Sequence, residues 1–444
     1  MNVCTGNSCR LDLDTVIEIE LLNETCMARI CLITPGQPSI NPRLVKEADT
    51  LVEAGHEVHV LCSHMVAWAD EADKKLLATR KWACSYVGGT TGSLLHAWTR
   101  LRHGFVRRFP GTWSADDWLG TRALTPVASD LFVAAVRCNA DLYVAHYSSA
   151  LAAAARAAKI NGSRVAFDAE DFESGYYVTK SGPQKIDLLI ESVERKYLPA
   201  CCYVTAGSSG IAAAYQSKYG IAMPTSILNV FALAERPSQF RPTASSGPLR
   251  LYWFSQTVGP GRGLAGVIRA MGKLRSCDIE LHLRGLARPE HWRQLQDLAA
   301  TNGVRPSAVI LHGPLPSDEM IRAASEFDVG MALEYPVSLN RDICLTNKIF
   351  SYLLAGNAIA ATATTAQKSI FDVIGKAGFL FEPGDIDALA EGLRCWSENR
   401  EQLQTARQQA WSWGTDCFNW DIEKRRFLQV VEGVMKRECA KSGR

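Results

Sequence analysis

Residues 328–361 constrain the fold of this chain more than any other stretch. Two runs within it, residues 328–333 and 358–361, are short and apolar enough to be buried strands. Residues 345–356 lie between them, with apolar side chains at helical spacing and a final glycine that can close a helix. A strand, a helix and a strand in this order are typical of a parallel α/β sheet, so we expect a Rossmann-like unit here.

The start of that helix is a candidate site for an anion. Thr346 or Asn347 can cap its N-terminus, and Lys348 adds a positive charge in the first turn. Free backbone N–H groups and the helix dipole both attract phosphate at this position of an α/β sheet. We therefore expect the diphosphate of a nucleotide here. The alternative is an ordinary Rossmann helix with a solvent-exposed lysine.

Similar strand and helix patterns occur twice along the chain. Strands at residues 29–34 and 58–61 enclose a helix in the first half, and strands at residues 249–254 and 279–285 open a second array. Pro, Ser and Gly are concentrated between the halves, which is typical of a linker. We predict an N-terminal extension of residues 1–27, an N-terminal domain of residues 28–235, a linker of residues 236–248, a C-terminal domain of residues 249–415, and a final helix and tail of residues 416–444.

The composition excludes several other classes of protein. The net charge of this 444-residue chain is only +2, so its overall charge gives no reason to expect nucleic acid as a partner. No run of about 18 or more apolar residues could span a membrane. The 14 cysteines contain no C-x-x-C pair and suit neither a metal site nor a disulfide framework. With no secretory signal visible at the start, we expect reduced thiols in a cytoplasmic protein.

Residues 345–356 resemble the donor-binding helix of family 4 glycosyltransferases, whose usual form is P-N-K-x-F-E-Y-x-x-x-G. The opening N-P-R-x-x-K-E-A from Asn41, the segment A-D-L-Y-x-A-H ending at His146 and a glycine-rich turn at residues 259–263 follow the order of that family. The resemblance covers about residues 28–437. It implies the α/β GT-B fold, in which two Rossmann-like domains face each other across a cleft and a C-terminal helix crosses back to the first domain.

The resemblance also implies the donor-binding residues. Arg262 would bind the donor diphosphate together with Lys348, and Gln256 stands where the family has a second cation, an arginine. In the family, two glutamates occupy the positions of Ile343 and Ser351. Ser351 is too short to reach a nucleotide ribose as glutamate does, and Glu334 could partly replace that glutamate. The donor-side candidates are Gln256, Gly261, Arg262, Gly263, Glu334, Thr346, Asn347, Lys348 and Ser351.

The acceptor-side candidates lie in the first half of the chain. Asn41 and Arg43 belong to a loop and helix start that face the cleft in the family. His146 follows a strand, where an imidazole facing the cleft could polarise or bond a substrate hydroxyl. Glu170 or Asp171 could accept the proton of the attacking group. The alternatives are a solvated loop for the first pair, a packed histidine, and an acidic segment that caps a helix.

Residues 93–109 combine apolar side chains at helical spacing with several arginines. This pattern is consistent with a basic amphipathic helix that touches an anionic membrane or a lipid-linked acceptor. Most amphipathic helices face a core, and the pattern also fits a domain helix whose apolar face packs inward and whose basic face is solvated. The sequence leaves both interpretations open.

The resemblance to family 4 glycosyltransferases implies a retaining, metal-independent hexosyltransferase, with a nucleotide sugar as co-substrate and no other cofactor. A saccharide, a lipid-linked molecule or a small molecule would be the acceptor, and polysaccharide biosynthesis is the expected process. The protein would be cytoplasmic, with peripheral contact at the inner face of a membrane as a further expectation. One alternative is an epimerase or hydrolase of nucleotide sugars on the same fold. The other, favoured by Gln256, Ile343 and Ser351, is an inactive nucleotide-binding scaffold.

Overall fold

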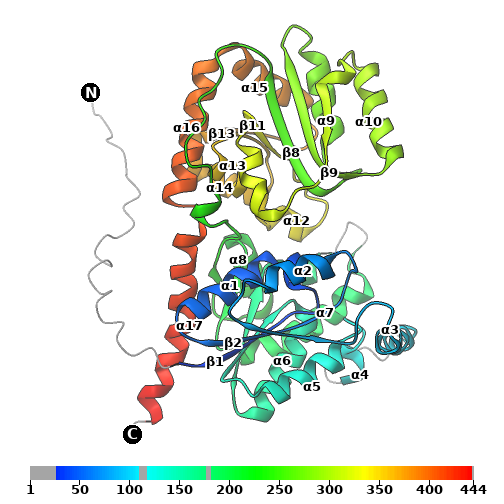
Figure 1. The fold of residues 1–444 in the computed structure, drawn as a ribbon, viewed down its shortest axis with the longest axis vertical. Helices are drawn as coiled ribbons and strands as arrows, with labels where there is room; N and C mark the ends of the chain where they lie inside the picture. The colour runs from blue at the N-terminus through cyan, green and yellow to red at the C-terminus, as the bar shows by residue number, and fades with distance from the viewer. Residues whose placement is uncertain (1–26, 110–117, 177–181, 443–444) are drawn as a thin grey trace.

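The computed structural model describes residues 27–109, 118–176 and 182–442 of the chain. Two domains lie one above the other in Figure 1, and each is a parallel sheet covered by helices. The short apolar runs of the sequence form the strands, which are buried because helices cover them. Within these described ranges, no helix has both the length and the apolar character required to cross a bilayer.

The N-terminal domain is built on a sheet of seven parallel strands. The strands are β1 (Arg29–Ile33), β2 (Glu57–Ser63), β3 (Ala83–Val87), β4 (Leu142–His146), β5 (Arg164–Ala169), β6 (Val204–Ala206) and β7 (Thr225–Ser226). The helices are α1 (Pro42–Glu53), α2 (Ala69–Leu77), α3 (Leu94–Arg107), α4 (Trp118–Thr121), α5 (Ala128–Cys138), α6 (Ser148–Asn161), α7 (Lys185–Tyr197) and α8 (Ser209–Tyr219). The strand order is β3-β2-β1-β4-β5-β6-β7. It reverses between β1 and β4, and ligands of such sheets bind outside the carboxyl ends of the strands at this position.

The C-terminal domain has a six-stranded parallel sheet of the same type. Its strands are β8 (Leu249–Val258), β9 (Ile279–Ala287), β10 (Val309–His312), β11 (Val329–Ala332), β12 (Ala358–Thr362) and β13 (Gly378–Phe381). Its helices are α9 (Leu264–Lys273), α10 (Pro289–Thr301), α11 (Met320–Ala324), α12 (Leu339–Ile343), α13 (Asn347–Ala355), α14 (Thr365–Ile374), α15 (Ile386–Glu398) and α16 (Arg400–Asp416). The order β10-β9-β8-β11-β12-β13 reverses between β8 and β11. The second expected ligand position is therefore at the carboxyl ends of these two strands.

Strands β8 and β9 are longer than their apolar patterns indicate. We expected β8 to end at Phe254 and to pass into a loop, but it continues to Val258 with a bulge between Phe254 and Thr257. Gly285 on β9 makes this close pairing possible, because a Cβ there would lie 2.2 Å from the Ser255 carbonyl oxygen. The expected loop assignment of Gln256 is therefore wrong, since this residue lies within the extended strand.

A last helix, α17 (Trp420–Ser442), returns from the C-terminal domain to the N-terminal one. In Figure 1 it runs along the side of the N-terminal domain, close to α1. The Trp420 indole nitrogen donates a 3.0 Å hydrogen bond to the Thr50 hydroxyl of α1. Phe427 and Val431 are buried in the same apolar cluster as Leu44 of α1. The predicted crossover helix is confirmed.

Candidate functional site

The predicted anion site of the C-terminal domain is organised by a buried carboxylate. Helix α13 starts beside the carboxyl ends of β11 and β12, with Thr346 at the N-cap position. The Thr346 hydroxyl donates to Glu334 Oε1 at 3.1 Å rather than capping the helix. Lys348 Nζ lies 3.0 Å from the same oxygen, and Arg341 Nη1 lies 3.5 Å from Glu334 Oε2. Two cations thus share one carboxylate, which leaves an excess of positive charge at the helix start.

The glycine-rich turn lies directly beside this cluster. Gly263 precedes α9, and a Cβ there would lie 2.9 Å from the Tyr335 ring and 3.0 Å from Leu333 Cβ. Gly261 and Gly263 both have positive φ angles, 72° and 76°, which favour glycine. Arg262 between them is partly exposed and forms no ion pair in the part of the chain that the structure describes. Its guanidinium is therefore available to a ligand.

Two donor-side candidates do not belong to the group formed by the glycine-rich turn and the start of α13. Gln256 is exposed on the extension of β8. Ser351 is fully buried, and its hydroxyl donates a 3.0 Å hydrogen bond to the Asn347 carbonyl oxygen one turn earlier in α13. Because the hydroxyl is turned toward its own helix, Ser351 does not replace the ribose contact of a glutamate.

Helix α12 carries the other position at which the family has a glutamate. Ile343 is 7% exposed and packs in the apolar core cluster of the N-terminal domain, across the domain boundary. Its carbonyl oxygen accepts a 2.7 Å hydrogen bond from the Ser208 hydroxyl. Asn340 donates to Asp171 Oδ1 at 3.0 Å and accepts from the Phe172 N–H at 2.7 Å. A segment of the C-terminal domain is therefore anchored in the N-terminal domain.

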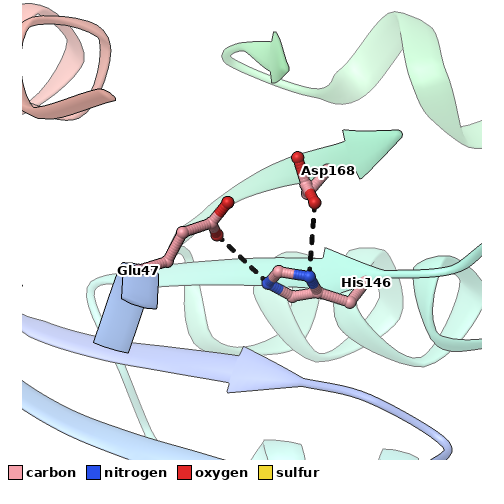
Figure 2. Close-up of side chains that lie close together, drawn as sticks. All are labelled: Glu47, His146 and Asp168. Atoms are coloured by element: carbon pink, nitrogen blue, oxygen red, sulfur yellow. Dashed lines mark ion pairs between the residues drawn. The ribbon is translucent and has the colours of Figure 1, made fainter. Parts of the chain in front are cut away.

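His146 ends β4 and is enclosed by two carboxylates, as Figure 2 shows. Its Nε2 atom lies 3.2 Å from Glu47 Oε2, and its Nδ1 atom lies 3.4 Å from Asp168 Oδ2. Burial alone would lower the pKa of His146, but the charges of Glu47 and Asp168 outweigh it and raise the pKa to about 10. The imidazole is 1% exposed. Our expectation that it faces the cleft is wrong, because the two carboxylates hold it inside the domain.

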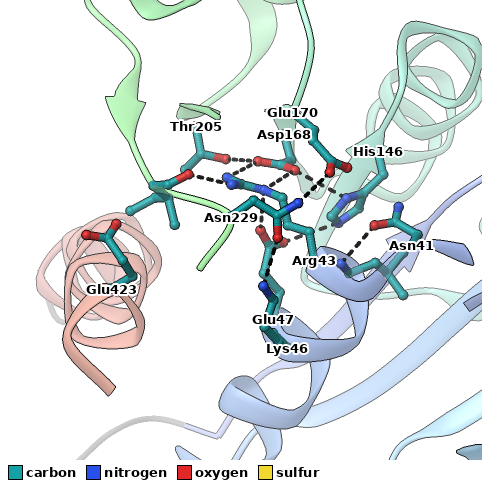
Figure 3. A network of polar contacts seen from close by, with 12 residues as sticks. Asn41, Arg43, Lys46, Glu47, His146, Asp168, Glu170, Thr205, Asn229 and Glu423 are labelled. Atoms are coloured by element: carbon teal, nitrogen blue, oxygen red, sulfur yellow. Dashed lines mark hydrogen bonds and ion pairs between the residues drawn. The ribbon is translucent and has the colours of Figure 1, made fainter. Parts of the chain in front are cut away.

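Arg43 completes this buried network (Figure 3). Its Nε and Nη2 atoms donate to the two Asp168 carboxylate oxygens at 2.7 and 2.6 Å, and Nη1 donates to the Ile227 carbonyl oxygen. This guanidinium holds the pKa of Asp168 well below its usual range, although burial opposes the shift. The expectation of a loop cation facing a ligand is wrong for Arg43, whose side chain is fully buried on the first turn of α1.

The same network has the residue types of a metal site. One ligand atom from each of Glu47, His146 and Asp168 can be chosen so that all lie within 4.8 Å of one another. Arg43 already engages both oxygens of Asp168, however, and its fixed positive charge would repel a cation. The cluster is better described as a buried ion-pair network that joins α1 to the carboxyl ends of β4 and β5.

Glu170 and Asp171 follow β5, as predicted, and both are partly buried. The Asn229 amide donates to Glu170 Oε1 at 2.8 Å, and Lys46 Nζ in turn lies 2.8 Å from Asn229 Oδ1. Burial and the neighbouring charge of Asp171 raise the pKa of Glu170 to about 7. A carboxyl group with such a pKa can take up a proton near neutral pH.

A pocket of about 580 Å³ opens at the carboxyl ends of β1, β2 and β4. Asn41, Tyr147, Asp171 and Glu173 line one side of it. Asn41 caps α1 by accepting from the Leu44 N–H at 3.1 Å, while its buried amide nitrogen has no partner among the described residues. Two acceptor-side candidates, Asn41 and Asp171, thus meet in one pocket.

The sequence analysis missed two residues of this pocket. Tyr147 has a φ angle of 72°, a strained conformation for a residue other than glycine. Glu173 accepts a 2.7 Å hydrogen bond from the Ser148 N–H, and burial with the charge of Glu194 raises the pKa of Glu173 to about 8. Neither property leaves a pattern in the sequence, because the strain and the burial depend on segments that are remote along the chain.

No family model matches this sequence, and no curated protein matches it either. Solved structures do match. HepE of Anabaena in complex with UDP has a TM-score of 0.65 at 16% identity, covering 92% of this chain and 100% of its own. Sucrose-phosphate synthase of Thermosynechococcus elongatus has a TM-score of 0.66 at 14% identity, with 92% and 99% covered. A glycosyltransferase of Rickettsia africae has a TM-score of 0.64 at 13% identity, with 93% and 99% covered.

Proposed function

We propose that this chain, which has the GT-B fold of those structures, is a glycosyltransferase that uses a nucleotide-sugar donor. One observation carries the proposal. The glycine turn with Arg262 and the start of α13 with Lys348 converge at the carboxyl ends of β8 and β11. Because HepE has been solved with UDP and with UDP-glucose, a uridine nucleotide is the first donor to test.

In the proposed reaction, the protein stabilises the charge of the departing nucleoside diphosphate. Lys348 has three N–H donors, so it can keep its contact with Glu334 and still bind a phosphate oxygen. Arg262 and the free N–H groups at the start of α13 would add to this stabilisation. These cations could replace a metal ion, and we propose retention of configuration on the strength of the family resemblance alone.

We place the acceptor in the pocket of the N-terminal domain. Asn41 and Asp171 supply polar contacts there, and Glu170 lies next to Asp171 in the chain. Glu170 or Asp171 would accept the proton of the attacking hydroxyl; Asp171 lines the pocket, and burial raises the pKa of both carboxyl groups. His146 has no direct contact with substrate in this proposal, because it is enclosed by Glu47 and Asp168.

A second candidate function is an inactive scaffold that still binds nucleotide. The observation that favours it is the position of Ile343, which packs in the N-terminal domain where the family has a glutamate. Such a protein would retain donor affinity without turnover. Activity on any acceptor would exclude this alternative.

Calorimetric titration with UDP, GDP, ADP and their sugar conjugates tests the donor site. We expect one nucleotide to bind, and Lys348→Ala to weaken binding by about 1.5–3 kcal/mol, the cost of losing a hydrogen bond to a charged group. Lys376→Ala is the matched control, because Lys376 is an exposed lysine of the same domain. If no nucleotide binds, or if Lys348→Ala binds the nucleotide as tightly as Lys376→Ala does, there is no donor site at α13.

A further inference from the structure

Helix α3 presents its apolar side to solvent. Leu94, Trp98, Leu101 and Phe105 share one helical face, and their exposed fractions are 91%, 57%, 67% and 67%. Leu95 beside them is 50% exposed. A contiguous exposed apolar face of this kind marks an interaction site in a folded protein.

Polar side chains hold the opposite face of α3 on the domain. Arg102 Nη2 lies 2.5 Å from Asp130 Oδ2 of α5 and donates to the Pro126 carbonyl oxygen at 3.2 Å. His103 Nε2 lies 3.0 Å from the Ala123 carbonyl oxygen. The buried residue of this helix is Thr99. The orientation is thus the reverse of that in an ordinary domain helix, and the interpretation of an inward apolar face is wrong.

The charges around this face favour one kind of partner. Arg100 and Arg107 of α3 are exposed, as is the C-cap residue Arg108, and the helix contains no acidic residue. A second copy of the chain would bring two sets of arginines together on the same apolar face, which is unfavourable. An anionic lipid surface satisfies both features, because it offers phosphate groups to the arginines and acyl chains to the leucines and aromatic rings.

We propose that α3 docks the N-terminal domain on an anionic membrane, with its apolar face in the boundary between headgroups and acyl chains. Figure 1 shows α3 at the outer edge of the domain, on the side away from α17. The helix would lie in the plane of the membrane, since it is too short to cross it.

Docking by α3 also defines the acceptor class. His96, Thr99 and Arg100 of α3 form a wall of the 580 Å³ pocket that contains Asn41 and Asp171. A protein bound through α3 therefore holds this pocket at the lipid surface. Resting on the proposed function of the pocket, we infer that the acceptor is a saccharide or hydroxyl compound carried on a lipid.

Co-sedimentation with vesicles tests the docking step directly. We expect the full-length chain to bind vesicles of phosphatidylcholine and phosphatidylglycerol, and not vesicles of phosphatidylcholine alone. The triple variant Leu94→Ser/Leu101→Ser/Phe105→Ser should lose at least about tenfold in partitioning, because each side chain no longer buries apolar area. The matched control is Ile160→Ser/Leu286→Ser/Val373→Ser, which changes three exposed apolar side chains on other elements.

A second pair of variants separates the charge contribution. Arg107→Gln/Arg108→Gln should weaken binding to the anionic vesicles by about fivefold for each arginine, and added salt should reduce the difference. Arg293→Gln/Arg425→Gln removes two exposed arginines elsewhere and should leave binding unchanged. Circular dichroism and thermal unfolding would show that every variant is folded.

Two results would overturn the proposal. One is equal vesicle binding by the wild type and the triple serine variant. The other is a dimer in light scattering that the triple variant dissociates, since a second copy would then cover α3. The nucleotide titration without vesicles reports on the donor site alone, so failure of membrane docking and failure of the proposed transferase function are distinguishable.

Discussion

At the scale of single residues, the N-terminal domain depends on charges that are shielded from water. Arg43, His146, Asp168 and Glu47 form one network, and removing one partner leaves another charge buried without compensation. Such a loss typically costs about 3–5 kcal/mol. The network therefore explains why these residue types are present without requiring any of them to touch a substrate.

The pH dependence of stability tests the charge state of His146. Its pKa is raised from 6.5 to about 10, so its contribution is complete below pH 6.5 and is lost as the pH rises through about 10. We expect His146→Gln to lower the free energy of unfolding by about 3–5 kcal/mol at neutral pH. The variant should also show a smaller decrease in stability between pH 6.5 and 10, measured by urea unfolding.

His56→Gln is the control for this series. His56 is also buried, but burial lowers its pKa, so its charge does not support the folded state above pH 6.5. Between pH 6.5 and 10, the free energy of unfolding of this variant should fall as much as that of the wild type. If His146→Gln keeps it as well, His146 is not the group that titrates.

At the scale of single residues, sequence reasoning placed side chains at the ends of strands and the starts of helices, but their roles toward a ligand stay predictions. Glu334 follows a predicted strand and Lys348 begins a predicted helix, and the structure brings them within 3.0 Å. It failed for His146, whose position at the end of its strand was predicted but whose surroundings were not. Glu47 comes from α1 and Asp168 from β5, and no local pattern indicates that both close over the imidazole.

At the scale of elements, α12 links the two domains through polar and apolar contacts. Ile343 supplies the apolar contact, so a glutamate at this position, as in family 4 glycosyltransferases, would place a carboxylate in the core of the N-terminal domain. We expect Ile343→Glu to open the contact rather than to create a ribose ligand. Hydrogen exchange of α8, which contacts α12, should become faster in this variant.

Leu339→Glu tests whether this effect depends on burial. Leu339 belongs to the same short helix but is 48% exposed, so a carboxylate there remains in water. Hydrogen exchange of α8 should then match that of the wild type. Equal acceleration in both variants would mean that α12 itself unfolds, and the proposed anchoring role of Ile343 would be wrong.

The limits of sequence reasoning differ for elements. Helical spacing identified which residues of α3 share a face, but spacing does not say which face turns inward. That choice depends on Asp130 and on the carbonyl groups of Ala123 and Pro126, which lie outside the helix. The extension of β8 was missed for a similar reason. Gln256 and Thr257 are exposed and show no strand pattern, and this segment is a strand because it pairs with β9.

At the scale of the whole molecule, the two-domain architecture could be predicted because the same βα pattern occurs twice. The crossover of α17 followed from the family resemblance, and its stabilising role is visible in the packing. Phe427 is fully buried between α17 and the N-terminal domain. We expect Phe427→Ala to lower the free energy of unfolding by about 3–5 kcal/mol, with faster hydrogen exchange in α1.

Gln429→Ala is the control for that measurement, because Gln429 is exposed on the same helix. Its effect should stay within about 0.5 kcal/mol, as for most surface substitutions. An equally small effect of Phe427→Ala would show that α17 contributes little to the stability of the N-terminal domain.

The path of α17 also has a consequence for synthesis of the protein. A ribosome makes the chain from its N-terminus, so residues 420–442 emerge after the entire C-terminal domain. Until then, the surface of α1 that Trp420 and Phe427 cover is exposed, and a nascent chain with such a surface is prone to aggregate. The domain that is translated first is therefore the one that is completed last.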